Sequence, residues 1–476
     1  MNETASANSL HDLIKDYKGT GDFTFGTDLS TSFSFIFHMA SNPHDCIITA
    51  YRIEPAGPIS QDLQKNVFDP IGRYRHTLEC TLNGITAEGG KITCKKLWIT
   101  AWGGSEVENG RKISITFSLG DEVEITYEVD PHEGNEQQVY LLTNLLFDGN
   151  EAAKRGLQDD WRGKSAIEVN GVRLEFVRLL SFKEIESNLK SPTGALTPTL
   201  VTTEVLSSSS ENIENELNEI IWSLCQLCTL GQHCSVTPQY FAVKVGKSWQ
   251  RILYRPNNEY GFNRYEPCVD FGRLKIEEND FKKYLEQCYN WYIRWRKEVN
   301  LDLLIYYTTQ FGLSRAPRSI EDIHPFYIFL CVAFESLAES AKDLQEKLGF
   351  EFPLQNQKKK FNTLQKYLES HRCCHPERGL EKLAKSIIYQ EPSFKEKLRA
   401  IFNEFEIGFS NEDLKLLYDM RNPVVHTGKL PKRIDHSYKE VLRWKDIYDQ
   451  VLLTIVGYKG GRRIVRSDNF KMTNLE

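Results

Sequence analysis

The spacing of apolar side chains changes near residue 276, and this change constrains the fold more than any other feature of the sequence. Before it, apolar and β-branched residues partly alternate with polar ones, a pattern typical of strands with one buried face. After it, apolar residues recur every three or four positions, as in helices that pack one face against a core. We therefore predict an α+β chain, with a β-rich sandwich or open barrel over 1–275 and an all-α bundle over 276–476.

The expected strands are rich in Ile, Thr, Val, Tyr and Trp; they cover 75–82, 91–102, 112–119, 122–129, 240–245 and 249–254. The strongest hairpin signal is Asn170-Gly171 between two alternating runs, because this dipeptide suits a two-residue turn. Residues 189–211 are rich in Ser, Thr and Pro, so we expect a flexible excursion there. A helix over 212–228 follows it.

The second half contains apolar stripes that predict a bundle of about five helices with short connections. One stripe covers 281–295, and a longer one covers 326–348 with Pro325 in its first turn. Further helices are expected over 356–370, 379–388, 393–405 and 437–456.

Length and charge limit the classes of function. At 476 residues the chain is long enough for two or three domains. A net charge of -6 argues against a strongly basic nucleic-acid coat, so any RNA contact must be a local patch. The sequence has no run of 18 apolar residues and no signal-peptide pattern, which predicts a cytoplasmic protein without a membrane partner. Its 11 cysteines, an odd number, suit reduced thiols better than a disulfide framework.

Two cysteine groups have the residue types of zinc ligands. Cys225, Cys228 and Cys234 lie close together in sequence, but the first two fall on a helical stripe and no second spaced pair follows. Cys373 and Cys374 are adjacent, which suits a single ion poorly. Metal binding at these groups stays open, and we expect the chemistry of the protein to need neither metal nor cofactor.

Three further segments have motif-like composition. Residues 246–248 read Gly-Lys-Ser, but strands flank them and Phe241 stands where a phosphate loop needs its first glycine, so we reject a nucleotide site. Residues 291–297 mix aromatics with cations as single-strand binders do, although aromatics on a helix more often belong to a core. The basic segment 459–463 is a better candidate for phosphate contact, with a solvated tail as the alternative.

A helix near the C-terminus carries the residues of greatest chemical interest. We expect it to begin near Asn411, after a capping-box-like Ser410 and Asp413, and to end near Asn422. The reason for that end is Pro423, which has no N–H to donate and restricts the residue before it.

Arg421 would then lie at a helix end, with His426 beyond the break. In an unbroken helix, side chains five residues apart point about 140° away from each other. The break expected at Pro423 removes this obstacle, so that a fixed cation and an imidazole can face one site.

This spacing resembles the Arg-x4-6-His signature of the HEPN superfamily of helical-bundle ribonucleases, with the polar Asn422 directly after Arg421 and His426 completing the motif. Arg318 and His324 also fit the spacing, but they lie in a Pro-flanked connector. The whole layout, a β-rich half that opens with Gly-Asp-Phe-Thr-Phe-Gly-Thr at 21–27 and a helical half that ends in the motif, resembles the ApeA family of anti-phage HEPN proteins.

The resemblance implies an abortive-infection ribonuclease that acts on RNA as a homodimer or higher homo-oligomer, in which two motifs share one cleft. His426 would act as general base on a ribose 2′-hydroxyl or as acid for the leaving 5′-oxygen, since an imidazole ordinarily titrates near neutrality. Arg421 would neutralise the charge that grows on the phosphorane oxygens, and Asn422 would either orient one of these two groups or cap the next turn. The products would be a 2′,3′-cyclic phosphate and a 5′-hydroxyl, and a phage-derived trigger would act at the β domain.

Two alternatives accompany this interpretation. In the first, the motif residues are only structural: Arg421 pairs with Asp419 or a helix end, and His426 fills a polar corner of the fold. At the level of the chain, the protein is a non-catalytic sensor whose β domain recognises a partner and whose bundle dimerises.

Overall fold

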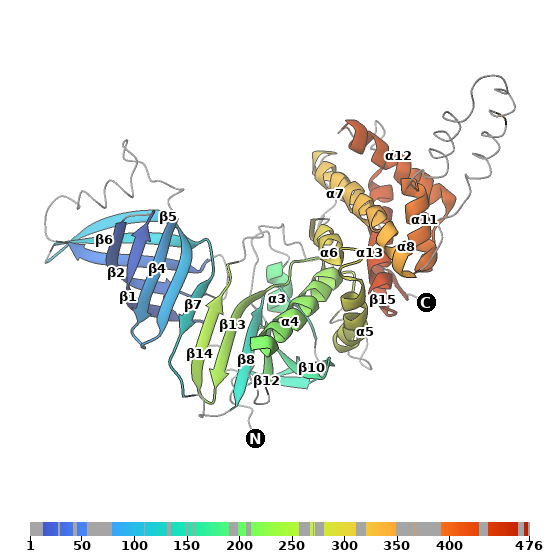
Figure 1. The fold of residues 1–476 in the computed structure, drawn as a ribbon. Helices are drawn as coiled ribbons and strands as arrows, with labels where there is room; N and C mark the ends of the chain where they lie inside the picture. The colour runs from blue at the N-terminus through green and yellow to red at the C-terminus, as the bar shows by residue number, and fades with distance from the viewer. Residues whose placement is uncertain are drawn as a thin grey trace, which may run out of the picture. The chain divides into compact units, whose positions relative to one another are not determined.

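The computed structural model divides the chain into two compact units, Met1–Tyr289 and Asn290–Glu476. The first contains a large antiparallel sheet and the second is helical, so the α+β fold class is confirmed (Figure 1). At some positions, including 424–427, only the backbone is described. The residues described are 13–26, 29–40, 45–54, 79–108, 110–130, 135–148, 151–155, 158–189, 199–205, 211–256, 267–269, 271, 280–310, 320–348, 366, 392–427, 437–464 and 471–474.

The first unit begins with a closed barrel. Its strands follow each other around the ring in the order β1-β2-β3-β6-β5-β4, and β4 pairs back to β1. Where the barrel closes, Gly21 of β1 lies opposite Gly84 of β4. The two backbones approach so closely there that a Cβ on either residue would clash with the opposite strand, so both positions require glycine. The strands are β1 (Asp16–Phe25), β2 (Leu29–His38), β3 (Ile47–Glu54), β4 (Glu79–Thr86), β5 (Lys91–Val107) and β6 (Gly110–Leu119).

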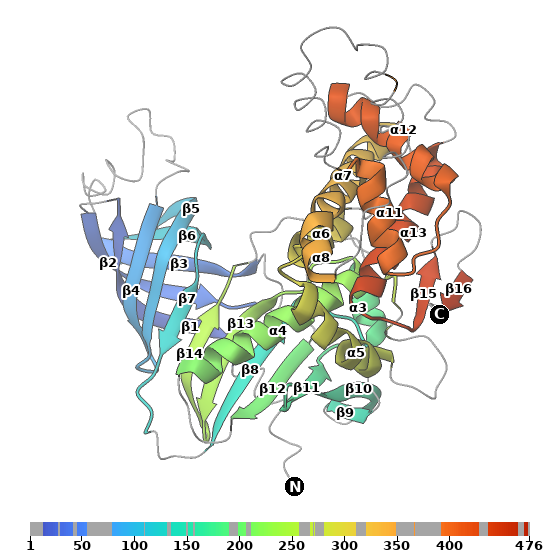
Figure 2. The same cartoon turned by 45° about the vertical axis from the view of Figure 1, so that its right-hand side comes forward.

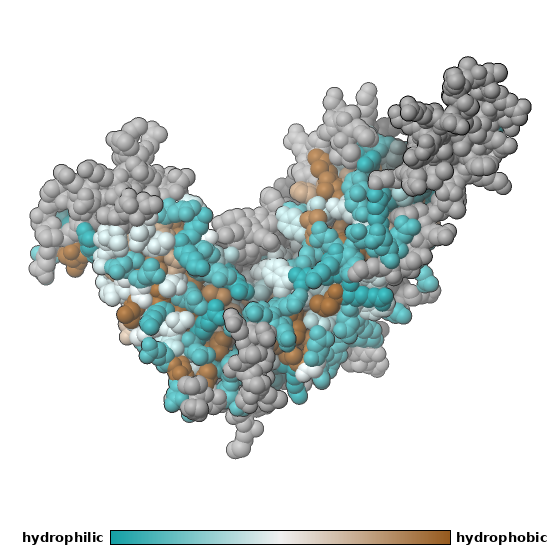
Figure 3. All heavy atoms as spheres, viewed as in Figure 1, coloured by the Kyte–Doolittle hydropathy of each residue, from teal (hydrophilic) through white to brown (hydrophobic). Residues whose placement is uncertain are grey.

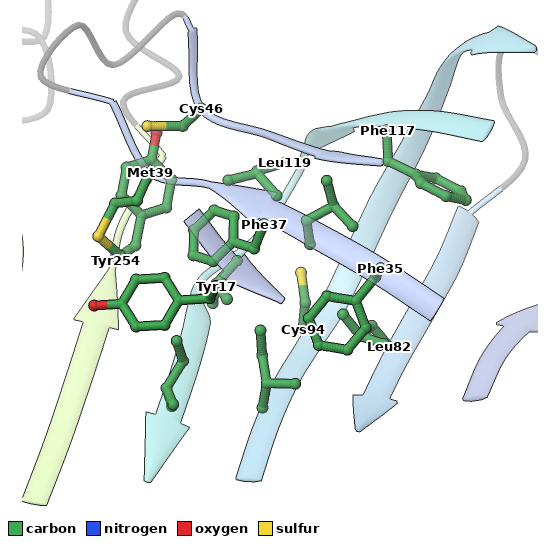
Figure 4. Packing of buried hydrophobic residues seen from close by; sticks show 14 of the residues in the cluster. Tyr17, Phe35, Phe37, Met39, Cys46, Leu82, Cys94, Phe117, Leu119 and Tyr254 are labelled. Atoms are coloured by element: carbon green, nitrogen blue, oxygen red, sulfur yellow. The ribbon is translucent and has the colours of Figure 1, made fainter. Parts of the chain in front are cut away.

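The interior of the barrel is filled by alternate side chains of its strands, as the period of two requires. Phe35, Leu82 and Phe117 are fully buried there (Figure 4). Phe37 packs edge-on against Tyr254 of a later strand, with ring centroids 6.1 Å apart, so the barrel core continues into the rest of the sheet.

The sheet leaves the barrel through β7 (Val123–Thr126), which pairs with the start of β5 and with β14. From there its order is β14-β13-β8-β12-β11-β10-β9. Helix α4 (Glu211–Gln232) packs against β13, and α3 (Phe182–Leu189) follows β11 (Figure 2). The remaining strands are β8 (Glu136–Leu142), β9 (Glu151–Arg155), β10 (Gln158–Val169), β11 (Val172–Arg178), β12 (Thr199–Val205), β13 (Pro238–Val245) and β14 (Ser248–Tyr254).

Most local expectations for this half are confirmed, and one is wrong in part. Asn170 and Gly171 form the hairpin turn of β10 and β11, with φ angles of 51° and 75°. Gly246 turns the chain between β13 and β14, as expected for a hairpin. The excursion expected over 189–211 contains β12, which pairs with both β11 and β8. Its threonines and valines favour a strand, and the Ser and Pro residues that suggested a loop lie on either side of it.

The helical unit includes two features that the apolar stripes did not predict. Helix α6 was not expected, and the stripe over 326–348 divides at Ser340 into α7 and α8, with α7 beginning five residues before Pro325. The helices expected over 356–370 and 379–388 lie outside the described residues. Helix α5 (Asp280–Trp295) crosses the boundary between the two units, which falls after Tyr289. The other elements of the helical unit are α6 (Leu301–Gln310), α7 (Ile320–Glu339), α8 (Ala341–Leu348), α11 (Phe394–Glu404), α12 (Asn411–Thr427), α13 (Ser437–Ile455), β15 (Gly461–Ile464) and β16 (Lys471–Asn474).

Helix α13 forms the core of this unit. Trp444 and Tyr448 are fully buried, and both pack edge-on against Phe334 of α7 with ring centroids 5.6 and 5.3 Å apart. The Tyr448 hydroxyl donates to the Leu304 carbonyl oxygen of α6 at 3.0 Å. Within the ranges given above, no helix is both long and apolar enough to cross a membrane.

Candidate active site

Helix α12 begins where the sequence predicts. The Ser410 N–H donates to an Asp413 carboxylate oxygen at 2.8 Å, and the Asp413 N–H donates to the Ser410 hydroxyl at 3.0 Å, which is a reciprocal capping box. Asp413 also pairs with Arg443 of α13. The first turn of α12 is therefore fixed by its own cap and tied to the central helix.

The expected end of α12 at Asn422 is wrong. The helix continues through Pro423 to Thr427. Proline inside a helix loses its own N–H bond and crowds one carbonyl, but neighbouring residues keep their bonds, so a long and well-packed helix can bend there without ending. Arg421 and His426 therefore occupy positions on one helix, and positions five residues apart are rotated by about 140° around the helix axis. The side chain of His426 lies outside the described residues.

Arg421 is held by side chains from three directions. Its Nε–H donates to the Glu335 carboxylate on α7, and its Nη1 donates to the Asn422 Oδ1 at 3.1 Å. The guanidinium also lies over the Phe394 ring of α11, 5.0 Å from the centroid. Only 16% of the side chain is exposed. Its ion-pair partner is thus Glu335 rather than Asp419 or a helix end.

These contacts leave part of the guanidinium available. Arginine has five N–H groups, and the two contacts named above use the Nε–H and one Nη1–H. Among the described residues, the other N–H groups of Arg421 make no hydrogen bond. The Nη edge can therefore donate two parallel bonds to a phosphate while Nε stays on Glu335.

Three helices meet around Arg421, since α7, α11 and α12 pack against one another (Figures 1 and 2). Helix α11 is positioned by a capping box at Ser393, directly before Phe394, and Lys395 lies 4.1 Å from the centroid of the Tyr418 ring of α12. The Phe394 ring that contacts the guanidinium therefore lies in the first turn of a capped helix, and a side chain on a well-ordered helix favours a rigid site.

Cys331 lies one turn before Glu335 on α7 and is not a candidate nucleophile. Burial raises the pKa of its thiol to about 12, while Arg421 acts to lower it and Glu335 to raise it. The thiol is therefore protonated at neutral pH, and a thiol rather than a thiolate is a poor nucleophile.

The cysteine groups do not form a metal site in the part of the chain that the structure describes, since no group of three or more His, Cys, Asp or Glu residues there could hold an ion. Cys225, Cys228 and Cys234 are buried free thiols. Burial raises the pKa of the Cys228 thiol well above its ordinary value, and the two neighbouring thiols add to the rise, which opposes the thiolate form that binds metal. Cys373 and Cys374 lie outside the described residues.

Comparison with known families identifies the segment around Arg421. Residues 330–457 match the family model described as Apea-like HEPN. This segment is an Apea-like HEPN domain. HEPN domains are a family of ribonucleases, often found in defence systems. The comparisons with curated proteins and with solved structures gave no match.

The HEPN domain begins inside α7 and ends directly after α13, so it contains Arg421, Asn422 and His426 together with Glu335 and Phe394. The sequence motif did not point to the last two residues. Glu335 could have been noticed as a carboxylate within an apolar stretch of α7, because such a group needs a cation nearby. Nothing in the sequence distinguishes Phe394 from an ordinary core aromatic.

Proposed function

We propose that the protein is a metal-independent endoribonuclease of the HEPN type that acts in anti-phage defence by abortive infection. The observation that supports this most is the guanidinium of Arg421, held by Glu335, Asn422 and Phe394 inside the HEPN match and five residues before His426. Cleavage would follow attack of a ribose 2′-hydroxyl on the adjacent phosphorus, giving a 2′,3′-cyclic phosphate and a 5′-hydroxyl.

Arg421 would stabilise the transition state. The Phe394 ring packs against the guanidinium, and the bond from Nε to Glu335 restricts its rotation. A donor held in place before the reaction costs no reorganisation when negative charge grows on the phosphorane oxygens, and such groups contribute strongly to catalysis. Asn422 accepts from Nη1 and therefore orients Arg421, which is one of the two roles expected for it.

Two copies of the chain would complete the site. One motif supplies a single imidazole, whereas cleavage needs one proton removed and another delivered. In addition, Arg421 and His426 occupy positions about 140° apart around one continuous helix. Both problems are solved if a symmetric homodimer places the arginine of one copy and the histidine of the other at the same phosphate.

The helical unit has apolar surface for such pairing. Ile328 and Val332 are 37% and 38% exposed, and helical spacing places them on the same face of α7 as Glu335. Leu303 and Tyr306 of the neighbouring α6 are exposed as well. Hydrophobic atoms are visible over α6 and α7 in Figure 3. A second copy that covers this face would bring its own α12 near the first.

A pocket in the first unit is a place where the β domain could bind a ligand, as both the non-catalytic alternative and a phage-derived trigger would require. It has a volume of about 330 Å³, and its lining includes Lys15, Glu88, Tyr127, Asp130 and Trp249. Cleavage of RNA by the purified protein, lost in the His426→Ala variant, would distinguish a nuclease with a sensor domain from a sensor alone.

Replacing Glu335 should affect turnover more than stability. Glu335→Ala frees the guanidinium to rotate, and because misplacing a catalytic group by about 1 Å can cost 100-fold, we expect kcat for RNA cleavage to fall about 10- to 100-fold with little change in KM. Glu335→Gln keeps an acceptor for Nε and should recover part of the loss.

The matched control is Glu339→Ala. Glu339 lies one turn further along α7 and pairs with Lys397 of α11 at 2.8 Å, so this variant also removes an ion pair between helices but does not touch Arg421. Its kcat should equal that of the wild type. Equal losses in the two alanine variants would show that Glu335 contributes only to the fold.

A further inference from the structure

The last turn of α5 and the segment after α13 lie against each other, although about 160 residues separate them in sequence. The contact is made at Gly457, where the chain leaves α13 with a φ of 73° and its N–H donates to the Thr454 carbonyl oxygen at 2.9 Å. A Cβ at this position would clash with the indole of Trp291. Gly457 thus ends helix α13 and also leaves room for the indole of Trp291. Lys459 follows two residues later and therefore lies close to Trp291.

Core packing explains two of the three large aromatics in this turn but not the third. Tyr292 and Trp295 are 0% and 2% exposed. Trp291 is 42% exposed, and Ile293, two residues further on, is 40% exposed. The alternative that these aromatics belong to the core therefore holds for Tyr292 and Trp295, while Trp291 presents part of its ring to solvent.

Three cations lie in this segment or next to Gly457, namely Arg294, Lys297 and Lys459. Arg294 is exposed and lies 5.5 Å from the centroid of the Trp291 ring and 4.6 Å from that of Trp295. Lys297 and Lys459 are exposed too. In the described ranges none of these three forms an ion pair, whereas Arg296, in the same segment, pairs with Asp302 at 2.9 Å.

We propose that Trp291, Arg294, Lys297 and Lys459, called the α5 patch here, bind single-stranded RNA at a point separate from the cleavage site. A base stacks on the exposed part of the Trp291 indole, and the cations contact the flanking phosphates. The choice of RNA as occupant rests on the proposed function. It is also supported by charge, because a local positive patch with an aromatic ring stands out on a chain whose net charge is -6.

The α5 patch lies away from Arg421 within the helical unit. Trp295, at the end of α5, packs against Phe405 at the end of α11, with ring centroids 6.2 Å apart, whereas Arg421 lies over Phe394 at the start of α11, so the length of α11 separates the two places. An RNA must therefore be long enough to reach both places, and the patch would favour long substrates over short ones through KM rather than through kcat.

Direct binding tests the proposal. The full chain with His426→Ala, which should not cleave, is titrated against a fluorescent single-stranded RNA of about 20 nucleotides at several salt concentrations. Adding Trp291→Ala should weaken binding about tenfold without changing the salt dependence, because stacking is not ionic, and Trp291→Phe should keep most of the affinity. Arg294→Ala and Lys459→Ala should each reduce the slope of log Kd against log salt by about 0.7.

Trp222→Ala is the matched control. Trp222 is 37% exposed on α4, but the residue one turn before it is Glu219 and no cation surrounds it in sequence, so this variant should bind RNA like the parent. Equal affinities of the Trp291→Ala and Trp222→Ala variants would overturn the α5 patch.

The test of the α5 patch and the test of the proposed nuclease can succeed or fail independently. RNA binding that depends on Trp291, in a wild-type chain that cleaves nothing, would retain the patch and refute the proposed function. Cleavage of RNA by a protein whose RNA affinity does not depend on Trp291 would support the nuclease and refute the α5 patch. With the nuclease active, Trp291→Ala should raise KM for a long RNA and leave the cleavage of a tetranucleotide unchanged.

Discussion

The His426→Ala variant is expected to lose about 10²- to 10⁴-fold in kcat for RNA cleavage while it folds and melts like the wild type. The imidazole is the proton-transfer group of the proposed site, and general acid–base catalysis contributes a factor of this size. Single-turnover cleavage of a labelled RNA measures the loss, and thermal unfolding monitors the fold. His38→Ala, at an exposed imidazole that pairs with Asp16 in the barrel, serves as the control and should be fully active.

The same variant tests the shared cleft. If each cleavage site needs both copies, mixing inactive subunits into wild type should depress activity out of proportion to their fraction. A strictly linear mixing curve, or a monomer that remains fully active at high dilution, would contradict the composite site while leaving His426 as a catalytic residue.

The Arg421→Lys variant is expected to lower kcat about 100-fold and to weaken RNA binding much less. Lysine keeps the charge but has no fork, so its ammonium cannot remain on Glu335 and also donate two parallel bonds to a phosphate. Loss of one transition-state donor of this kind costs about 10²- to 10³-fold. Rate and affinity are measured separately, by single-turnover cleavage and by binding to an RNA with 2′-deoxy substitution at the cleaved position.

Arg443→Lys is the matched control for that substitution. Arg443 also lies in the HEPN domain and pairs with a carboxylate, that of Asp413, but it is 60% exposed and does not contact Arg421. This variant should keep wild-type turnover. Unchanged turnover in Arg421→Lys would mean that the contacts of Arg421 with Glu335 and Phe394 serve only to join helices.

The features of the fold that were predictable from sequence are those set by local physics. The change of apolar period separates sheet from helix because burial of one face imposes a period on each. The capping box at Ser410 and the Asn170-Gly171 turn each depend on a few neighbouring residues, and both are found where expected. Closure of the barrel depends on pairing between β1 and β4, which lie far apart in sequence, and no local pattern encodes it.

At the candidate site, the sequence predicts a helix end at Asn422 that the structure does not have, and it does not point to Glu335. Both differences arise from tertiary packing, which local sequence patterns do not encode. Pro423 is a strong helix breaker taken alone, yet α12 is held at its start by a cap and Arg443 and at Arg421 by α7 and α11, and it continues. Glu335 lies 86 residues before Arg421, so its role becomes visible only when α7 and α12 pack together. The motif indicates which residues would carry the proposed chemistry but not how they are held.

The most direct test of the proposed nuclease is the chemistry of the RNA ends that it leaves in the presence of EDTA. Purified protein is incubated with a labelled RNA and excess chelator, and the products are resolved by mass. Because base, acid and charge stabiliser are all side chains, the account predicts fragments that end in a 2′,3′-cyclic phosphate and begin with a 5′-hydroxyl, and their absence in the His426→Ala variant. Fragments with a 3′-hydroxyl and a 5′-phosphate, or cleavage that EDTA abolishes and a divalent metal restores, would contradict it.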